Sequence, residues 1–328
     1  MHDIALIGAG RIGKIHAANI AANPRLRLSR VVDPFADAAA ALAAEHGATV
    51  SSVEEALADP AIRGVVVASS TDTHLDYSLA AAEAGKAVFC EKPLDQDLAR
   101  ASKAAERLEA IGAKLFLAFN RRFDPNFASL QARLAGGEVG TLETLHIISH
   151  DPSPPPIEYV RVSGGIFKDM VIHDFDMARW LLGEEVTEVF ASSSVLIDPA
   201  IGEAGDADTA KTILRTASGR LCVISSSRRS GYGYDQRIEA FGSKGMIRAQ
   251  NQLESTVETW GENGSAGDKL QNFFLDRYAV AYAREAAHFA DVIDGKAAPL
   301  IGYTDGVRAL ALAEAAAKSA ASGELVRL

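Results

Sequence analysis

The chain contains very little cysteine and no long apolar run. Its two cysteines, Cys90 and Cys222, are too few for the disulfide framework that stabilises small secreted domains. No apolar run approaches the roughly 18–20 residues that a membrane-spanning helix requires. The opening segment MHDIALIGAG has no basic residues before its apolar part, so it is not typical of a signal peptide. These absences predict a cytoplasmic protein with no membrane partner.

Positive charge is also scarce. The 33 lysines and arginines face 43 acidic residues, which gives a formal net charge of -10 at pH 7. Nucleic acids and anionic membranes bind concentrated positive charge, and the pairs Arg121-Arg122 and Arg228-Arg229 form no basic stripe. We therefore expect no nucleic-acid partner. The length of 328 residues favours two domains of roughly 100–200 residues each.

Short apolar runs alternate with alanine-rich segments over residues 1–121. The apolar runs are continuous, which is typical of parallel strands that are covered on both faces. This pattern predicts an α/β Rossmann-type N-terminal domain with a parallel sheet. The expected strands are 4–8, 28–33, 64–69, 87–91 and 114–119, and the expected helices are 11–22, 36–46, 53–58, 73–85 and 95–111.

The pattern changes after the segment FNRRFDP. Longer strands with alternating polar residues follow, and few helices separate them. Residues 122–328 are therefore expected to form an α+β C-terminal domain with an open, mainly antiparallel sheet. The expected strands are 141–150, 186–197, 209–217, 220–228, 234–242 and 246–260, the expected helices are 124–136, 166–182, 276–294 and 303–322, and loops are expected at SHDPSPPP and at 262–268.

The motif GAGRIG follows the first expected strand and opens the first expected helix. In this context Gly8 allows a tight turn, Gly10 lets a pyrophosphate approach the backbone, and Gly13 allows close packing of helix and strand. The helix N-terminus offers free N–H groups and a partial positive charge to the phosphates. The motif predicts a dinucleotide site, and the alternative is a glycine turn without a ligand.

Asp33 lies at the end of the second expected strand, where a carboxylate binds the adenosine ribose. A carboxylate at this position accepts hydrogen bonds from the ribose hydroxyls and repels a 2′-phosphate. The predicted cofactor is therefore NAD rather than NADP. Arg30 is nearby, but it precedes the end of the strand.

The segment FCEKPL begins like a buried strand and ends in two opposite charges and a proline. Ligands of open α/β sheets bind beyond the carboxyl ends of the strands, so Glu91 and Lys92 are expected at the nicotinamide end of the groove. Pro93 fixes a backbone torsion there. A lysine at this place can hold an alcohol oxygen and stabilise the developing alkoxide. The alternative is a surface ion pair.

The segment GGIFKDMVIHDFDMARWL places Asp169 and His173 four residues apart, on one face of an expected helix. Oxidation of a secondary alcohol needs a base for the hydroxyl proton, and a histidine with a carboxylate partner can serve as that base. Two alternatives stay open. Asp174 and Asp176 could form a metal site with His173, although the spacing matches no strong ligand motif, or His173 could be a hydrogen-bonded interface residue.

These motifs occur together with TDTH at residues 71–74, and the combination resembles the Gfo/Idh/MocA oxidoreductase family over essentially the whole chain. The segments RFDPNF, SGGIFKDMVIHDFDMARWLLGEE, AIGEAGDADTA and SRRSGYGYDQRIEAFGSKGM are similar to those of bacterial inositol 2-dehydrogenases. The resemblance implies NAD-dependent oxidation of a cyclic polyol, myo-inositol to 2-keto-myo-inositol, in inositol catabolism. Another inositol isomer or an aldose is the nearest alternative substrate, and a catalytically silent NAD-binding regulator is a further alternative.

The resemblance also implies roles for individual residues. Lys92, Asp169 and His173 would be the catalytic set, with His173 as proton acceptor. The implied cofactor contacts are Gly8, Gly10, Arg11, Ile12, Gly13, Asp33, Ser69, Ser70, Thr71, His74, Glu91, Lys92 and Asn120. The implied substrate contacts are Lys92, Asp151, Asp169, His173, Tyr234 and Tyr282, although the two tyrosines could instead be core or interface aromatics. No metal is implied, and the open sheet would join subunits of a homo-oligomer, either a dimer or a tetramer.

The sequence departs from the pattern of the family at three places. Ser69-Ser70 stands where relatives commonly carry Thr-Pro, His150 stands where an arginine is expected, and Ser226 stands where asparagine is usual. The last two lie on the expected C-terminal sheet, outside the catalytic set.

Overall fold

The computed structural model describes residues 1–328, which divide into two compact units. The first unit comprises Met1–Phe123 and Ala281–Leu310, and the second comprises Asp124–Val280 and Ala311–Leu328. The sequence analysis assigned all of 122–328 to the second domain, whereas the contacts place Ala281–Leu310 with the first unit. None of the helices combines the length and the apolar content that crossing a bilayer requires.

The packing of helix α11 (Ala279–Asp294) explains this assignment. Its side chains Phe289 and Ile293 cover Gly64 of the first unit so closely that a Cβ atom there would lie 2.8 Å from Phe289. Both side chains are buried. The apolar face of this helix therefore belongs to the core around the first sheet.

The first unit contains a six-stranded sheet of order β3-β2-β1-β4-β5-β6, in which every pairing is parallel. This is the Rossmann order, and the predicted fold class of the N-terminal part is confirmed. The strands are β1 (His2–Ile7), β2 (Leu26–Val32), β3 (Thr49–Val50), β4 (Ile62–Val67), β5 (Ala87–Cys90) and β6 (Leu115–Leu117). The two-residue strand β3 was not expected, because both of its residues are exposed and give no apolar signal.

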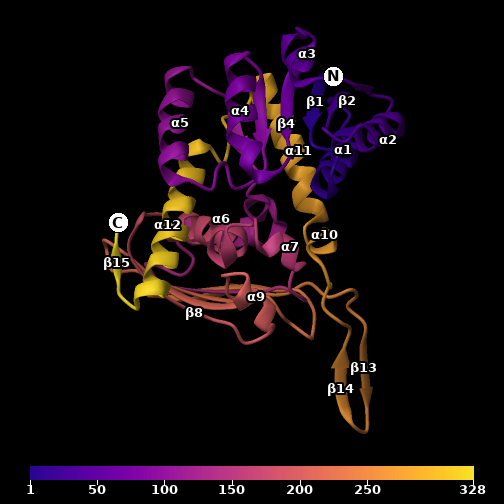
Figure 1. The fold of residues 1–328 in the computed structure, drawn as a ribbon. Helices are drawn as coiled ribbons and strands as arrows, with labels where there is room; N and C mark the ends of the chain where they lie inside the picture. The colour runs from indigo at the N-terminus through magenta and orange to yellow at the C-terminus, as the bar shows by residue number, and fades with distance from the viewer. The chain divides into compact units, whose positions relative to one another are not determined.

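Five α-helices of the first unit connect these strands, close to the expected ranges (Figure 1). They are α1 (Arg11–Ala22), α2 (Ala36–His46), α3 (Val53–Ala58), α4 (His74–Glu83) and α5 (Leu98–Ala110), with 3₁₀ turns η1 (Thr71–Thr73) and η2 (Asn120–Phe123). Helix α5 begins later than residue 95, because Asp97 is its N-cap and accepts hydrogen bonds from the amides of Ala99 and Arg100.

The second unit is built on a seven-stranded sheet of order β12-β11-β7-β10-β9-β8-β15. Only the β7–β10 pairing is parallel, so the predicted open, mainly antiparallel sheet is confirmed. The strands are β7 (Leu142–His150), β8 (Val186–Ser194), β9 (Thr209–Thr216), β10 (Leu221–Ser227), β11 (Asp235–Gly242), β12 (Gly245–Ala249) and β15 (Val326–Arg327).

The expected strand 246–260 and the expected loop 262–268 were wrong. Strand β12 ends at Ala249, and a separate hairpin, β13 (Glu258–Gly261) and β14 (Gly264–Gly267), extends away from the sheet (Figure 1). The strand ends there because the side chain of Asn251 takes over from the backbone and accepts a hydrogen bond from the amide of Gln236 at 2.7 Å.

Two of the expected helices are divided. The segment 166–182 forms a π-helical turn η3 (Phe167–Val171), which contains Asp169, followed by α8 (Ile172–Leu182). The segment 276–294 breaks at Tyr278 into two helices. The remaining helices are α6 (Pro125–Ala135), α7 (Ile157–Val160), α9 (Pro199–Glu203), α10 (Phe274–Arg277) and α12 (Tyr303–Ser322). Helices α6 and α8 pack against β12 and β7, whereas the opposite face of the sheet carries exposed side chains.

Candidate functional site

The glycine-rich turn at the end of β1 is sterically constrained at two of its three glycines. Gly8 has φ of 108°, and a Cβ atom there would lie 2.3 Å from the carbonyl oxygen of Ala68. A Cβ atom at Gly13 would lie 2.0 Å from the carbonyl oxygen of Gly8. Gly10, the N-cap of α1, faces open space, with nothing within 4 Å of a Cβ position. The turn is thus closed toward the protein and open at the backbone where a pyrophosphate could approach.

Asp33 lies directly after β2 and is oriented by backbone amides. The amide of Ala9 donates to Oδ2 at 2.7 Å and the amide of Phe35 donates to Oδ1 at 2.8 Å. Arg30, which could have favoured NADP, donates instead to Asp59 at 3.0 Å. A fixed carboxylate next to the glycine-rich turn, with Arg30 paired to Asp59, suits the ribose of NAD.

We expect substitution of Asp33 by alanine to raise the KM for NAD about tenfold to a hundredfold. Hydrogen bonds to a charged group contribute about 1.5–3 kcal/mol, and loss of the carboxylate also removes the repulsion of a 2′-phosphate. The preference for NAD over NADP should therefore shrink. Initial rates with both cofactors measure the effect, and the exposed Asp37→Asn on α2 is the control. An unchanged cofactor preference would contradict the assignment.

His74 connects the two loops that follow β4 and β5. Its Nδ1 lies 2.8 Å from the carbonyl oxygen of Pro93, and its Nε2 lies 3.2 Å from that of Ser69. The side chain is buried. The predicted cofactor residue His74 therefore also fixes the position of the loop that contains Ser69 relative to Glu91–Pro93, here called the EKP loop.

The EKP loop begins at the carboxyl end of β5. Glu91 lies there with Oε1 2.6 Å from Nε2 of the buried His16 of α1. Lys92 follows, half-buried, and its peptide bond to Pro93 is cis. Sequence reasoning missed His16, although its position on the first turns of the helix after GAGRIG points toward the same end of the sheet. The pair ties the EKP loop to the helix that carries the glycine motif.

Glu285 of α11 is a buried acid that the sequence analysis did not single out. It is fully buried, and neither of its carboxylate oxygens has a hydrogen-bond partner. Burial raises the pKa of Glu285 well above its ordinary value, and the negative charge of Glu91 adds to this shift. Burial therefore disfavours the ionised form of Glu285 in the folded protein.

Because the pKa of Glu285 is raised in the folded state, the protein should lose folding free energy as pH rises. The contribution of Glu285 is fully present below the ordinary glutamate pKa of about 4.3 and is lost as pH rises through the pKa of the folded state. The Glu285→Gln variant lacks this titration. Its melting temperature should therefore exceed that of the wild type by an amount that grows between pH 4 and pH 8, at about a few degrees per kcal/mol. Thermal unfolding at several pH values measures this, with the exposed Glu106→Gln as control. Parallel curves for Glu285→Gln and the wild type would refute it.

The second unit carries the other predicted catalytic residues. Asp169 lies in the π-helical turn η3, and His173 lies in the first turn of α8; both are half-buried. Short π-helical turns of this kind are frequent at functional sites. The carboxylate of Asp169 accepts a hydrogen bond from the hydroxyl of Tyr159 at 2.7 Å and lies 3.3 Å from Nη1 of Arg228. Tyr159 and Arg228 were not among the predicted site residues.

The metal alternative at α8 gains no support from the geometry. Asp174 and Asp176 are fully buried. No group of three or more histidine, cysteine, aspartate and glutamate side chains is arranged to hold a metal ion.

The predicted substrate residues fall on both units. Asp151 follows β7, and its amide donates to the carbonyl oxygen of Ser227 at 2.9 Å. Tyr234 is buried, with its ring edge-on to that of Tyr278 at a centroid distance of 6.0 Å. Tyr282 was expected in the second domain but belongs to the first unit, because α11 packs there; its ring lies 6.0 Å from that of His16.

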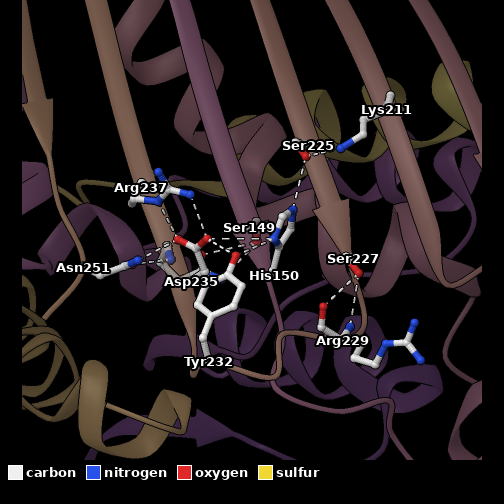
Figure 2. A network of polar contacts seen from close by, with 11 residues as sticks. Ser149, His150, Lys211, Ser225, Ser227, Arg229, Tyr232, Asp235, Arg237 and Asn251 are labelled. Carbon is white, nitrogen blue, oxygen red and sulfur yellow. Dashed lines mark hydrogen bonds and ion pairs between the residues drawn. The ribbon is translucent and has the colours of Figure 1, made fainter. Parts of the chain in front are cut away.

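A polar network closes one end of the seven-stranded sheet (Figure 2). The fully buried Asp235 accepts hydrogen bonds from Arg237 at 2.7 and 2.9 Å, from the hydroxyl of Tyr232 at 2.7 Å and from Asn251 at 2.7 Å. Burial opposes ionisation of Asp235, but these hydrogen bonds outweigh it and hold its pKa below the usual value. Asp235 is a satisfied structural acid.

His150 lies in the same network, between Asp235 and Ser225 (Figure 2). Its Nε2 is 3.2 Å from Oγ of Ser225, and its Nδ1 is 3.9 Å from Asp235. Burial lowers the pKa of His150 despite the nearby charge of Asp235. The order Asp235, His150, Ser225 resembles a catalytic triad. However, the backbone amides of these strands bond to neighbouring strands and cannot stabilise an oxyanion, and Lys211 donates a hydrogen bond to the Ser225 hydroxyl. We assign it no chemistry.

Both cysteines are free and buried. Burial raises the pKa of Cys90 to about 12 and raises that of Cys222 as well. Burial therefore disfavours the thiolate form of both side chains at neutral pH.

Together, a Rossmann sheet with a constrained glycine turn, a fixed carboxylate at the end of β2 and the EKP loop at the end of β5 are the features of an NAD-binding oxidoreductase. Comparison with known families agrees. Residues 2–119 match the "Oxidoreductase family, NAD-binding Rossmann fold" and residues 127–248 match the "GFO/IDH/MocA C-terminal domain". The chain belongs to the GFO/IDH/MocA oxidoreductase family, as its motifs predicted.

Relatives match along almost their whole length. The inositol 2-dehydrogenase of Rhizobium meliloti (strain 1021) is 48% identical over 316 residues, which is 96% of each chain. The myo-inositol 2-dehydrogenase of Thermotoga maritima is 46% identical over 327 residues, 99% of this chain and 98% of that one. The crystal structure of a myo-inositol dehydrogenase from Corynebacterium glutamicum matches with a TM-score of 0.96 at 45% identity, covering 100% of this chain and 99% of the other.

Proposed function

We propose that this protein oxidises one secondary hydroxyl of a cyclic polyol with NAD, converting myo-inositol to 2-keto-myo-inositol in inositol catabolism. The observation that carries the proposal is the 46–48% identity to two dehydrogenases named for inositol over nearly the whole chain. The presence of Lys92, Asp169 and His173 supports it.

In this proposal His173 takes the hydroxyl proton, Asp169 orients the imidazole, and Lys92 holds the reacting oxygen. NAD supplies the hydride acceptor, and the glycine turn, Asp33 and the EKP loop hold it. Much of the rate comes from positioning, because the alcohol and cofactor are held together during the transfer. Residues 1–121 would bind the cofactor, and 122–328 would bind substrate and join subunits, with the Ala281–Leu310 segment packing on the first unit.

The test is formation of NADH, followed by absorbance, with a panel of inositol isomers and aldoses. Myo-inositol should give the highest kcat/KM. Faster turnover of another isomer or of an aldose would replace the substrate within the same reaction class. No NADH with any member, together with tight NAD binding, would indicate the catalytically silent regulator instead.

We further propose that the chain acts in the cytoplasm as a homo-oligomer that assembles through the open face of the seven-stranded sheet. Two buried free thiols are compatible with a reducing compartment. Phe190, Ile213 and Val223 are paired across neighbouring strands and so share a face, and Phe190 and Ile213 are 38% and 45% exposed. Phe241 and Met246, paired with each other, are also exposed, at 48% and 43%. A cluster of exposed apolar side chains on one face of a sheet is typical of a subunit interface.

We expect Ile213→Glu to shift the protein toward smaller assemblies, because a charge would be buried between subunits. Size-exclusion chromatography with light scattering measures the mass. The matched control is Ile111→Glu, since Ile111 is 46% exposed on the first unit and Ile213 is 45% exposed. An assembly that both variants leave intact would remove this face as the interface.

A further inference from the structure

Arg228 is a charged side chain in the interior of the second unit. It follows the last residue of β10, and only 1% of its surface is exposed. Its guanidinium lies between two carboxylates, with Nη1 3.3 Å from Oδ2 of Asp169 and Nη2 3.4 Å from Oδ2 of Asp206. A buried arginine is retained only where it is paired, and these two acids are its ionic partners.

Arg228 and Tyr159 contact different oxygens of the Asp169 carboxylate. The hydroxyl of Tyr159 donates to Oδ1, and Arg228 faces Oδ2. Tyr159 is 45% exposed and Arg228 is buried, so the arginine contact is the one shielded from solvent. Arg228 therefore contacts one oxygen of the Asp169 carboxylate from the interior side.

Asp206 holds the other end of this chain of contacts. Its Oδ1 accepts a hydrogen bond from the amide of Ile166 at 2.8 Å, immediately before η3. Gly165 has φ of 84°, and a Cβ atom there would lie 3.0 Å from the same oxygen, so the backbone closes tightly over this acid. Asp206 thus ties Arg228 to the start of the turn that carries Asp169.

We propose that Arg228 is a positioning residue that acts through Asp169, with Asp206 holding its guanidinium in place. This inference rests on the proposed roles of Asp169 and His173 in oxidation. A lysine could not replace the arginine fully, since a single ammonium lacks the planar fork that reaches two carboxylates at once. The neighbouring Arg229 is exposed and offers a matched control.

The test is a double-mutant cycle on kcat with the wild type, R228M, D169N and R228M/D169N. Each single substitution should lower kcat about tenfold to a hundredfold, with a smaller change in KM and no change in NAD binding. The double variant should be about as slow as the slower single variant, because Arg228 acts through the acid that D169N has already neutralised. R228K should recover part of the loss, and R229M should behave as the wild type.

R228M leaves two buried acids without their cation, so its melting temperature is measured alongside. If R228M does not fold, the same double-mutant cycle with D169N is measured for R228K and for D206N instead. Two results would overturn this inference and leave the proposed function intact, provided that H173A is inactive. One is a double variant whose loss of kcat is the product of the two single losses. The other is a normal kcat in R228M or, where R228M does not fold, in both R228K and D206N. A wild type without inositol-dependent NADH formation would overturn the proposed function and this inference with it.

Discussion

Substitution of His173 by alanine should lower kcat for inositol oxidation by about 10²- to 10⁴-fold, the usual contribution of a positioned general base. The dissociation constant for NAD, measured by fluorescence titration, should stay near the wild-type value, because the implied cofactor contacts lie within residues 8–120 and do not include His173. His46→Ala, a partly exposed histidine at the end of α2, is the matched control.

The pH dependence gives a second readout for the same variant. A base must be unprotonated to accept the hydroxyl proton, so kcat/KM for oxidation should rise with pH across the range in which imidazoles lose their proton. The His173→Ala variant should lack this rise. A wild-type profile that is flat, or a variant with near-normal turnover at neutral pH, would show that His173 is not the base.

Substitution of Lys92 by alanine should lower kcat by about 10²- to 10³-fold. A cation that contacts the developing alkoxide stabilises the transition state more than the ground state, so turnover should fall more than substrate binding weakens. Stopped-flow measurement of the first turnover isolates the chemical step. Lys103→Ala on α5, where the lysine is exposed, should leave the rate unchanged.

Lys92→Arg tests the same role by geometry. Arginine keeps the charge but presents it on a longer, planar group, so the rate should recover only partly. Wild-type turnover in Lys92→Ala would exclude an oxygen-holding role, whatever Lys92→Arg does.

Most of the parallel sheet of the first unit, and the helices that connect its strands, followed from the sequence because their signals are local. Continuous apolar runs such as GVVVAS mark strands buried on both faces, and the expected helices over 11–22, 36–46 and 53–58 have the bounds that the structure gives. The fold class, the family and the cofactor were predicted from such motifs. The residue roles stay predictions, because they depend on where a substrate binds.

The misses have a different physical origin. The hairpin of β13 and β14 consists of exposed residues without an apolar alternation, so its strands give no pattern. The link between Asp169 and Arg228 joins positions 59 residues apart, which no spacing rule connects. One signal was present: Cys222, Ile224 and Ser226 are the buried positions of β10, and the same alternation places Arg228 inside and Arg229 outside.

The chain returns to its first unit after completing most of the second, and this has a consequence for protein engineering. A fragment that stops at Phe123 contains all six parallel strands but lacks Phe289 and the carbonyl group of Ile301, to which the amide of Leu117 donates at 3.0 Å. Residues 1–123 alone therefore do not make a complete nucleotide-binding unit that can be moved to another protein. Chimeras that exchange this unit between relatives would need three crossovers, one after Phe123 and one at each end of Ala281–Leu310, rather than a single cut in the middle of the gene.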